Sequence, residues 1–231
     1  MFDYRRMLEV QKLFNADLLD IVPLERGFTY ACRETLPEGG DAVMFYLYNQ
    51  EIDLFEKIPI ISYIKYKFGD NAAVIARELG DFVTCTVAVM SNSRVVSYQD
   101  GRLLVIGNGG EIVSECSVEY LDNPACSPAV VGTDLWLAVP DSNAIINYSV
   151  KHNRTEFRIG SPSAKAFCHP THISVYDNKL FICNANSYKI RTIGLDNYTD
   201  ADYCVFNEPV YKYFRVGDVE YAVMQSGVYS L

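Results

Sequence analysis

Two stretches of the chain, LWLAVPDSNAIINY (Leu135–Tyr148) and LFICNANSYKIRTI (Leu180–Ile193), align without a gap at an offset of 45 residues. In each, two apolar runs flank a short polar turn, which is the pattern of an antiparallel β-hairpin. A proline and a short apolar run precede each hairpin, at Pro128–Val131 and Pro170–Val175. The sequence therefore predicts a repeated unit of at least three strands.

The same pattern recurs in outline at Ala42–Phe55, Arg102–Cys116 and Val219–Leu231, so that five turns are centred near residues 49, 108, 141, 186 and 226. Antiparallel strands that repeat every 40–45 residues or so are typical of propeller blades. A blade cannot bury both of its faces alone, so blades must stack and the ring must close. We predict an all-β fold, a small five-bladed β-propeller that occupies residues 1–231 as a single domain. The alternative, an irregular β-sandwich, would not need a repeat of this length.

Two segments have the pattern of helices. Residues 1–17 are predicted to form an N-terminal amphipathic helix that begins at Asp3, because apolar residues from Met7 to Phe14 form a stripe. A short helical insertion is predicted near residues 70–80, where Asp70 stands at the start and Gly80 follows the last turn. The last unit lacks an outer strand, and we expect residues 18–24 to supply it and so close the ring.

Composition narrows the functional classes. Of the 231 residues, 49% are hydrophobic and 21% charged, which is typical of a globular protein and not of a disordered chain. The formal net charge of −9 argues against nucleic acid as a partner, and no apolar run reaches the length of a membrane helix. The N-terminal residues lack the apolar core of a secretory signal, so we expect a cytoplasmic protein. Its seven cysteines contain no C-x-x-C pair and are expected to be reduced core thiols.

The segment from His169 to Ile193 resembles an NHL-type propeller repeat. It has a proline, an apolar pair, an apolar strand, a polar Asn turn and an Ile strand flanked by Lys and Arg. The copy at Ser127–Tyr148 looks similar, although Ala144–Ile146 replaces the usual basic residue. The resemblance covers residues 127–195 and implies a propeller fold. Because propellers host both binding modules and enzymes, it implies no particular function.

Propeller ligands usually meet at one end of the central channel, where turns of successive blades converge. We therefore predict a binding ring of amide and carboxylate groups from Asn49, Asn108, Asp141, Asn143, Asn184, Asn186 and Gln225. Such groups can hydrogen-bond to a sugar, a peptide or a protein loop. The competing interpretation is that these residues only make the turns, because Asn, Asp and Ser tolerate turn geometry and bond to their own backbone.

His169 and His172 form the only close histidine pair and are weak candidates for metal ligands. A zinc site needs three or four ligands, and no third ligand stands nearby in the sequence. We therefore expect no cofactor, with calcium or zinc as the alternative. In metal-dependent lactonase-type propellers a glutamate, an asparagine and an aspartate surround calcium. Asp141 and Asn184 occupy compatible turns here, but a glutamate from an early blade would have to complete the set.

The sequence contains no G-x-S-x-G, H-E-x-x-H or P-loop motif. We therefore predict a non-catalytic interaction module, a rigid scaffold that binds a protein partner. A structural subunit of a larger assembly, such as a virus particle, is one form of that role. The alternatives are a metal-dependent lactonase or hydrolase, and a lectin-like carbohydrate-binding propeller.

Overall fold

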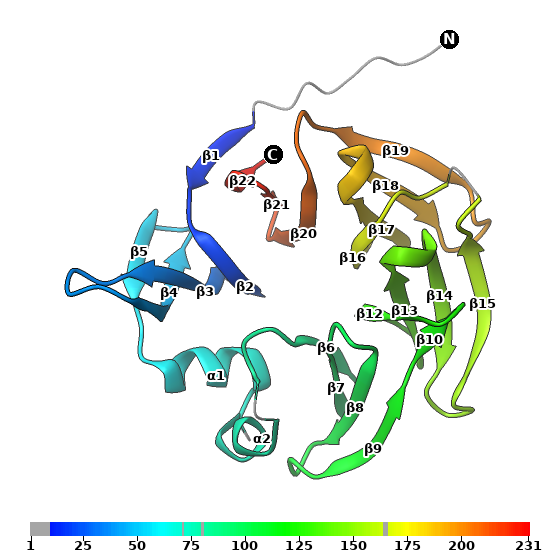
Figure 1. The fold of residues 1–231 in the computed structure, drawn as a ribbon, viewed down its shortest axis with the longest axis horizontal. Helices are drawn as coiled ribbons and strands as arrows, with labels where there is room; N and C mark the ends of the chain where they lie inside the picture. The colour runs from blue at the N-terminus through cyan, green and yellow to red at the C-terminus, as the bar shows by residue number, and fades with distance from the viewer. Residues whose placement is uncertain (1–9, 71, 80, 164–165) are drawn as a thin grey trace.

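A computed structural model describes residues 10–231 except 71, 80 and 164–165. Five four-stranded antiparallel sheets stand around a common centre, as the blades of a propeller (Figure 1). The prediction of a five-bladed β-propeller is thus confirmed. No helix within the described residues is both long and apolar enough to cross a membrane.

The strands of each blade are given in order from the innermost to the outermost. Blade 1 contains β2 (Asp17–Leu24), β3 (Gly27–Thr35), β4 (Asp41–Asn49) and β5 (Leu54–Lys57). Blade 2 contains β6 (Thr86–Met90), β7 (Ser93–Ser97), β8 (Arg102–Gly107) and β9 (Ile112–Ser117). Blade 3 contains β12 (Cys126–Val131), β13 (Asp134–Val139), β14 (Ala144–Ser149) and β15 (Arg154–Gly160). Blade 4 contains β16 (Pro170–Tyr176), β17 (Lys179–Asn184), β18 (Lys189–Gly194) and β19 (Asp200–Val205). Blade 5 contains β20 (Val210–Val216), β21 (Val219–Met224), β22 (Gly227–Ser230) and β1 (Gln11–Phe14).

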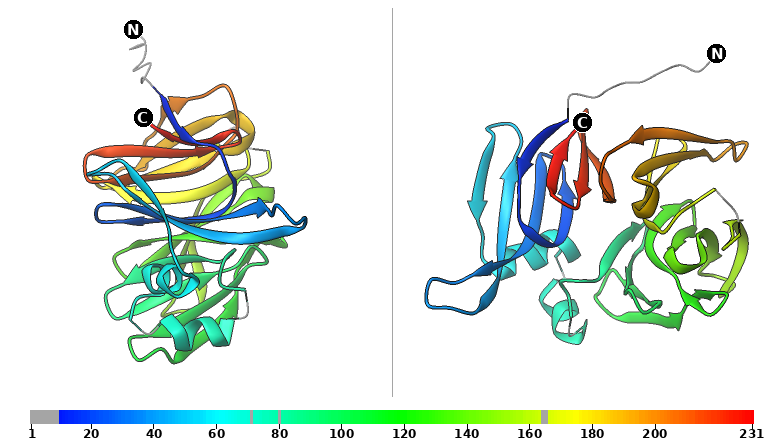
Figure 2. Two further views of the ribbon diagram at one scale, coloured as in Figure 1. Left: turned by 90° about the vertical axis from the view of Figure 1, so that its left-hand side faces the viewer. Right: turned by 45° about the horizontal axis from the view of Figure 1, so that its top comes forward.

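The ring is closed by β1, which pairs antiparallel with β22 as the outer strand of blade 5 (Figure 2). Gly227 permits this pairing, because a Cβ atom there would lie 2.3 Å from the Phe14 carbonyl oxygen. Residues 18–24, the predicted closing strand, instead belong to the inner strand of blade 1. The strand that closes the ring is therefore Gln11–Phe14 and not residues 18–24.

The predicted N-terminal helix is wrong for Gln11–Phe14, which form strand β1, and residues 1–9 of the prediction lie outside the described residues. Pairing with β22 gives the backbone of β1 hydrogen-bond partners that a helix would have supplied internally. Phe14 also stacks on Tyr30 with ring centroids 4.6 Å apart and meets Phe55 edge-on at 5.3 Å. These tertiary contacts override the helical spacing of the apolar residues.

Two helices separate blade 1 from blade 2. Helix α1 (Ile60–Phe68) and helix α2 (Ala72–Leu79) stand between the two sheets (Figure 1). Tyr63 and Phe68 of α1 share one buried cluster with Phe45 of blade 1 and Val96 of blade 2. The other four junctions pack sheet directly on sheet, each with its own apolar cluster. The two helices therefore fill the space between blades 1 and 2 and complete the ring there.

The predicted insertion near residues 70–80 corresponds to α2, whereas α1 was not expected. The segment of α1 is rich in Ile and Tyr, which favour strands when judged by propensity alone. Its buried residues Tyr63, Ile64, Lys67 and Phe68 nevertheless follow the three- and four-residue spacing of one helix face. Packing against blades 1 and 2 therefore stabilises this segment as a helix and not as a strand.

Strand direction gives the ring two distinct faces. Within a blade the first-to-second and third-to-fourth turns lie on one face, which we call the hairpin face. The second-to-third turns lie on the other, together with the connections from each blade to the next; we call this the crossover face. The connections on the crossover face include α1, α2 and a small hairpin of β10 (Glu119–Tyr120) and β11 (Asn123–Pro124). Two of its turns are short 3₁₀ helices, Pro140–Ser142 and Ala185–Ser187.

Candidate functional site

A cavity of about 450 Å³ lies between the five inner strands, at the centre of the ring. Every inner strand contributes to its wall, and Tyr66 and Lys67 reach it from α1. Three of the residues that line it are charged, namely Asp20, Lys67 and Lys212. Charged groups in a central cavity make this the first place to look for function.

Three polar side chains reach the cavity through equivalent β-bulges. The pairing of β2 with β3 shifts register just before Asp20, that of β16 with β17 just before His172, and that of β20 with β21 just before Lys212. A bulge adds one residue to a strand and re-aims the side chains that follow it. Because blades 4, 5 and 1 are neighbours in the closed ring, the bulges align His172, Lys212 and Asp20 along one arc of the channel.

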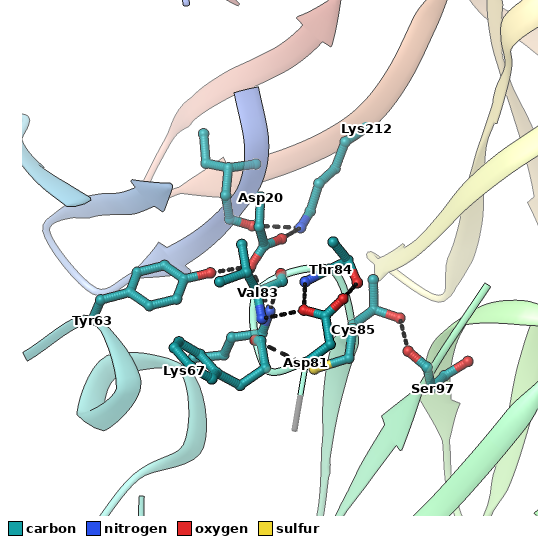
Figure 3. A network of polar contacts seen from close by, with 12 residues as sticks. Asp20, Tyr63, Lys67, Asp81, Val83, Thr84, Cys85, Ser97 and Lys212 are labelled. Atoms are coloured by element: carbon teal, nitrogen blue, oxygen red, sulfur yellow. Dashed lines mark hydrogen bonds and ion pairs between the residues drawn. The ribbon is translucent and has the colours of Figure 1, made fainter. Parts of the chain in front are cut away.

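Asp20 is the centre of a polar network (Figure 3). Its Oδ2 atom accepts hydrogen bonds from the Tyr63 hydroxyl at 2.6 Å and from Lys67 Nζ at 2.8 Å. Lys212 Nζ lies 3.6 Å from the other carboxylate oxygen and donates to the Ile21 carbonyl. Lys67 also donates to the Val83 carbonyl at 2.8 Å. The network therefore joins helix α1, blade 1 and blade 5.

The charges are strongly shielded from water. The side chain of Lys67 is 1% exposed, that of Asp20 9% and that of Lys212 19%. Burial alone would raise the pKa of Asp20, but the ammonium groups of Lys67 and Lys212 outweigh it and hold that pKa below its ordinary value. Burial lowers the pKa of Lys212, although Asp20 partly opposes the effect. Two cations therefore share one carboxylate.

His172 stands beside this network as a neutral group. Burial, followed by the nearby Lys212, lowers the pKa of its imidazole well below 6.5. Its Nδ1 atom is buried and has no hydrogen-bond partner among the described residues, and the same holds for the Ser174 hydroxyl two residues along β16. Both side chains line the cavity. Buried polar atoms without partners are uncommon and mark a place where a bound group could supply them.

The predicted ring of turn residues is divided between the two faces. Asp141, Asn143, Asn184, Asn186 and Gln225 belong to second-to-third turns on the crossover face. Asn49 and Asn108 adjoin third-to-fourth turns, so they lie on the hairpin face. Asn49 accepts a hydrogen bond from the Glu51 amide at 3.0 Å, which is a local turn contact. The seven residues therefore do not form one ring.

Asn143 and Asn184 hold the connection that leads into blade 4. The Asn143 side-chain oxygen accepts a hydrogen bond from the His169 amide at 2.8 Å, and that of Asn184 accepts one from the Cys168 amide at 3.1 Å. Asn184 is fully buried. Backbone amides of Asn186 and Gln225 also bond to connections between blades, at the carbonyls of Cys168 and Pro209. These residues of the predicted site stabilise the crossovers.

The bulge in β16 separates the histidine pair. His169 lies on the crossover face with its Nδ1 atom 3.7 Å from an Asp141 carboxylate oxygen, whereas His172 turns into the channel. In the described part of the chain, no group of three or more His, Cys, Asp or Glu side chains is placed to hold a metal ion.

Sequence reasoning missed Asp20, Lys67 and Lys212. A signal was present for two of them, because Asp20 interrupts the apolar run LLDIV and Lys212 interrupts the aromatic run YKYF. A charged residue inside a strand of buried character requires a partner or a ligand. Lys67 could not be recognised in this way, since α1 itself was not expected.

No family model matches the chain, and no curated protein matches it. Among solved structures it is similar to Sqt1 from Saccharomyces cerevisiae, with 14% identity and a TM-score of 0.55 over 91% of this chain and 71% of that one. It is also similar to virginiamycin B lyase from Staphylococcus aureus, with 10% identity and a TM-score of 0.55 over 94% and 80% of the two chains. The WD40 repeats of RRP9 match at 7% identity and a TM-score of 0.52, over 94% of this chain and 60% of that one. At this level of identity the comparisons establish the propeller fold, which agrees with the fold that the NHL-type resemblance implied.

Proposed function

We propose that the protein is a non-catalytic interaction module whose crossover face binds a protein partner. The observation that carries the proposal is the distribution of exposed tyrosines. Of the four exposed tyrosines in the described residues, three belong to segments of the crossover face: Tyr66 in α1, Tyr188 in a blade 4 turn and Tyr211 at the start of β20. Tyrosine is enriched at protein interfaces, where its ring buries area and its hydroxyl stays hydrogen-bonded.

The blades present these side chains on a rigid support. Five apolar clusters join neighbouring blades around the ring, and the pairing of β1 with β22 closes it. A preorganised surface loses little conformational entropy on binding. WD40 repeats occur among the structurally similar proteins, which supports an interaction role by analogy of fold. A structural subunit of a larger assembly, such as a virus particle, would use the same face.

Two tyrosines of blade 4 provide a matched test. Tyr188 on the crossover face is 41% exposed, Tyr198 on the hairpin face is 50% exposed, and both have a positive φ, at 58° and 54°. Asparagine tolerates this backbone conformation, so Tyr188→Asn and Tyr198→Asn should both fold. We expect affinity capture from the native host to recover a partner with the wild type and with Tyr198→Asn, and to lose it with Tyr188→Asn. Equal recovery with both variants would contradict the proposal.

A further inference from the structure

We propose that the central cavity binds a small organic monocarboxylate, with its carboxylate at Lys212 and its apolar body against the inner strands. This site is built mainly from the channel wall and not from the exposed turns, and it shares only Tyr66 of α1 with the proposed partner surface.

The charge balance of the cavity indicates an anion. Its lining contains two ammonium groups, on Lys67 and Lys212, and one carboxylate, on Asp20. His172 stays neutral, so the lining has a net charge of one positive unit in a chain whose overall formal charge is −9. The Asp81 carboxylate, outside the lining, also interacts with Lys67, so the excess positive charge that a bound anion would neutralise lies at Lys212, which is 19% exposed. A single excess charge matches a monoanion better than a dianion.

Lys212 is the cation with capacity left for a ligand. Lys67 is held between Asp20 at 2.8 Å and the Val83 carbonyl at 2.8 Å, and its side chain is almost fully buried. Lys212 donates one hydrogen bond, to Ile21, and its distance of 3.6 Å from Asp20 is that of an ion pair rather than a close hydrogen bond. The Ser174 hydroxyl also belongs to the lining and lacks a hydrogen-bond partner among the described residues.

The rest of the cavity suits an apolar body. Each inner strand contributes an apolar residue to the wall: Val22, Val87, Val130, Val175 and Phe214. The cavity opens to solvent and measures about 450 Å³, which is within the usual range for a small-molecule site. A carboxylic acid with a short hydrocarbon chain would satisfy both the charged arc and these walls.

Isothermal titration calorimetry on the full chain tests the proposal, with hexanoate as the probe and hexanamide as its neutral isostere. We expect hexanoate to bind with a dissociation constant on the order of a millimolar. Hexanamide should bind roughly tenfold more weakly or worse, because it lacks the charge that Lys212 recognises. Inorganic phosphate, largely a dianion near pH 7.5, should bind more weakly than hexanoate.

Substitutions test whether Lys212 is the cation that binds the carboxylate of the ligand. Lys212→Met should weaken hexanoate binding by roughly tenfold or more, while Lys151→Met, at an exposed lysine in the β14–β15 turn, should leave it unchanged. Asp20→Asn removes the competing carboxylate and should strengthen binding, which keeps the test decisive if Lys212→Met fails to fold. Equal binding of hexanoate and hexanamide, no binding of either, tighter binding of phosphate, or full affinity in Lys212→Met would each overturn the proposal.

Discussion

Replacing Gly227 with alanine tests how the ring is closed. Gly227 begins β22 with a φ of +146°, and a Cβ atom there would lie 2.3 Å from the Phe14 carbonyl oxygen and 3.0 Å from Lys12 Cε. The closer contact is with backbone, so a side-chain rotation cannot relieve it. Strand β1 would have to move away from β22, and the pairs Lys12–Tyr229 and Phe14–Val228 would be lost or distorted.

The size of the effect follows from the aromatic contacts of β1. Truncation of a fully buried phenylalanine costs roughly 3–5 kcal/mol. Phe14 is half-buried and stacks on Tyr30 at 4.6 Å, so losing its packing should cost about 2 kcal/mol. The positive φ adds about 1 kcal/mol for any side chain with a Cβ atom. We expect Gly227→Ala to lower the free energy of unfolding by about 3 kcal/mol.

Gly217 is the matched control, because it lies in the same blade with a φ of +57° and has nothing within 4 Å of the position of a Cβ atom. Gly217→Ala should therefore cost only about 1 kcal/mol. Urea denaturation can be followed by the fluorescence of Trp136, the single tryptophan. Trp136 is buried in blade 3, whereas β1 belongs to blade 5, so neither substitution touches the probe. Equal destabilisation by the two variants would refute closure by β1.

Three further predictions concern the channel network and the thiols. Tyr63→Phe removes the 2.6 Å hydrogen bond to Asp20 and keeps the aromatic ring of the side chain. It should lower the free energy of unfolding, measured by urea denaturation at pH 7, by about 2 kcal/mol. An unchanged free energy of unfolding would show that Asp20 does not need the hydroxyl. The lowered pKa of His172 means that below pH 6.5 the unfolded chain takes up a proton that the folded chain does not. Stability should therefore fall as the pH drops below 6.5, by up to about 1.4 kcal/mol per unit; the slope should be shallower in His172→Asn, and an unchanged slope would contradict the burial of a neutral imidazole. Burial raises the pKa of Cys32, Cys85 and Cys126 to about 11, so in native protein at pH 8 a thiol reagent should modify these three only after unfolding, and rapid labelling of any of them would contradict their placement.

The blade repeat could be predicted from the sequence because its signals are local. Apolar runs and Asn or Asp turns define each hairpin, and the best copies, at Leu135–Tyr148 and Leu180–Ile193, align with no gap. It is harder to predict from the sequence which of the three turns of a blade each polar segment forms. Second-to-third and third-to-fourth turns use the same residue types, so the turns at Asn49 and Asn108 were matched to turns on the opposite face.

The features that were missed depend on contacts between distant segments. Strand β1 forms because β22 offers a partner more than 200 residues away in sequence, and α1 forms because two blades leave a space that it fills. The channel arc depends on bulges, which arise from the register between two strands and have no fixed residue signature. Single-residue patterns therefore located the blades but not the side chains at their centre.

Hydrogen exchange of the protein with and without its captured partner decides which face is used for binding. If the crossover face binds the partner, exchange should slow at residues 119–124, 185–188 and 206–211, which all lie on that face. Protection confined to the hairpin-face turns at residues 50–53, 108–111 and 195–199 would contradict the account.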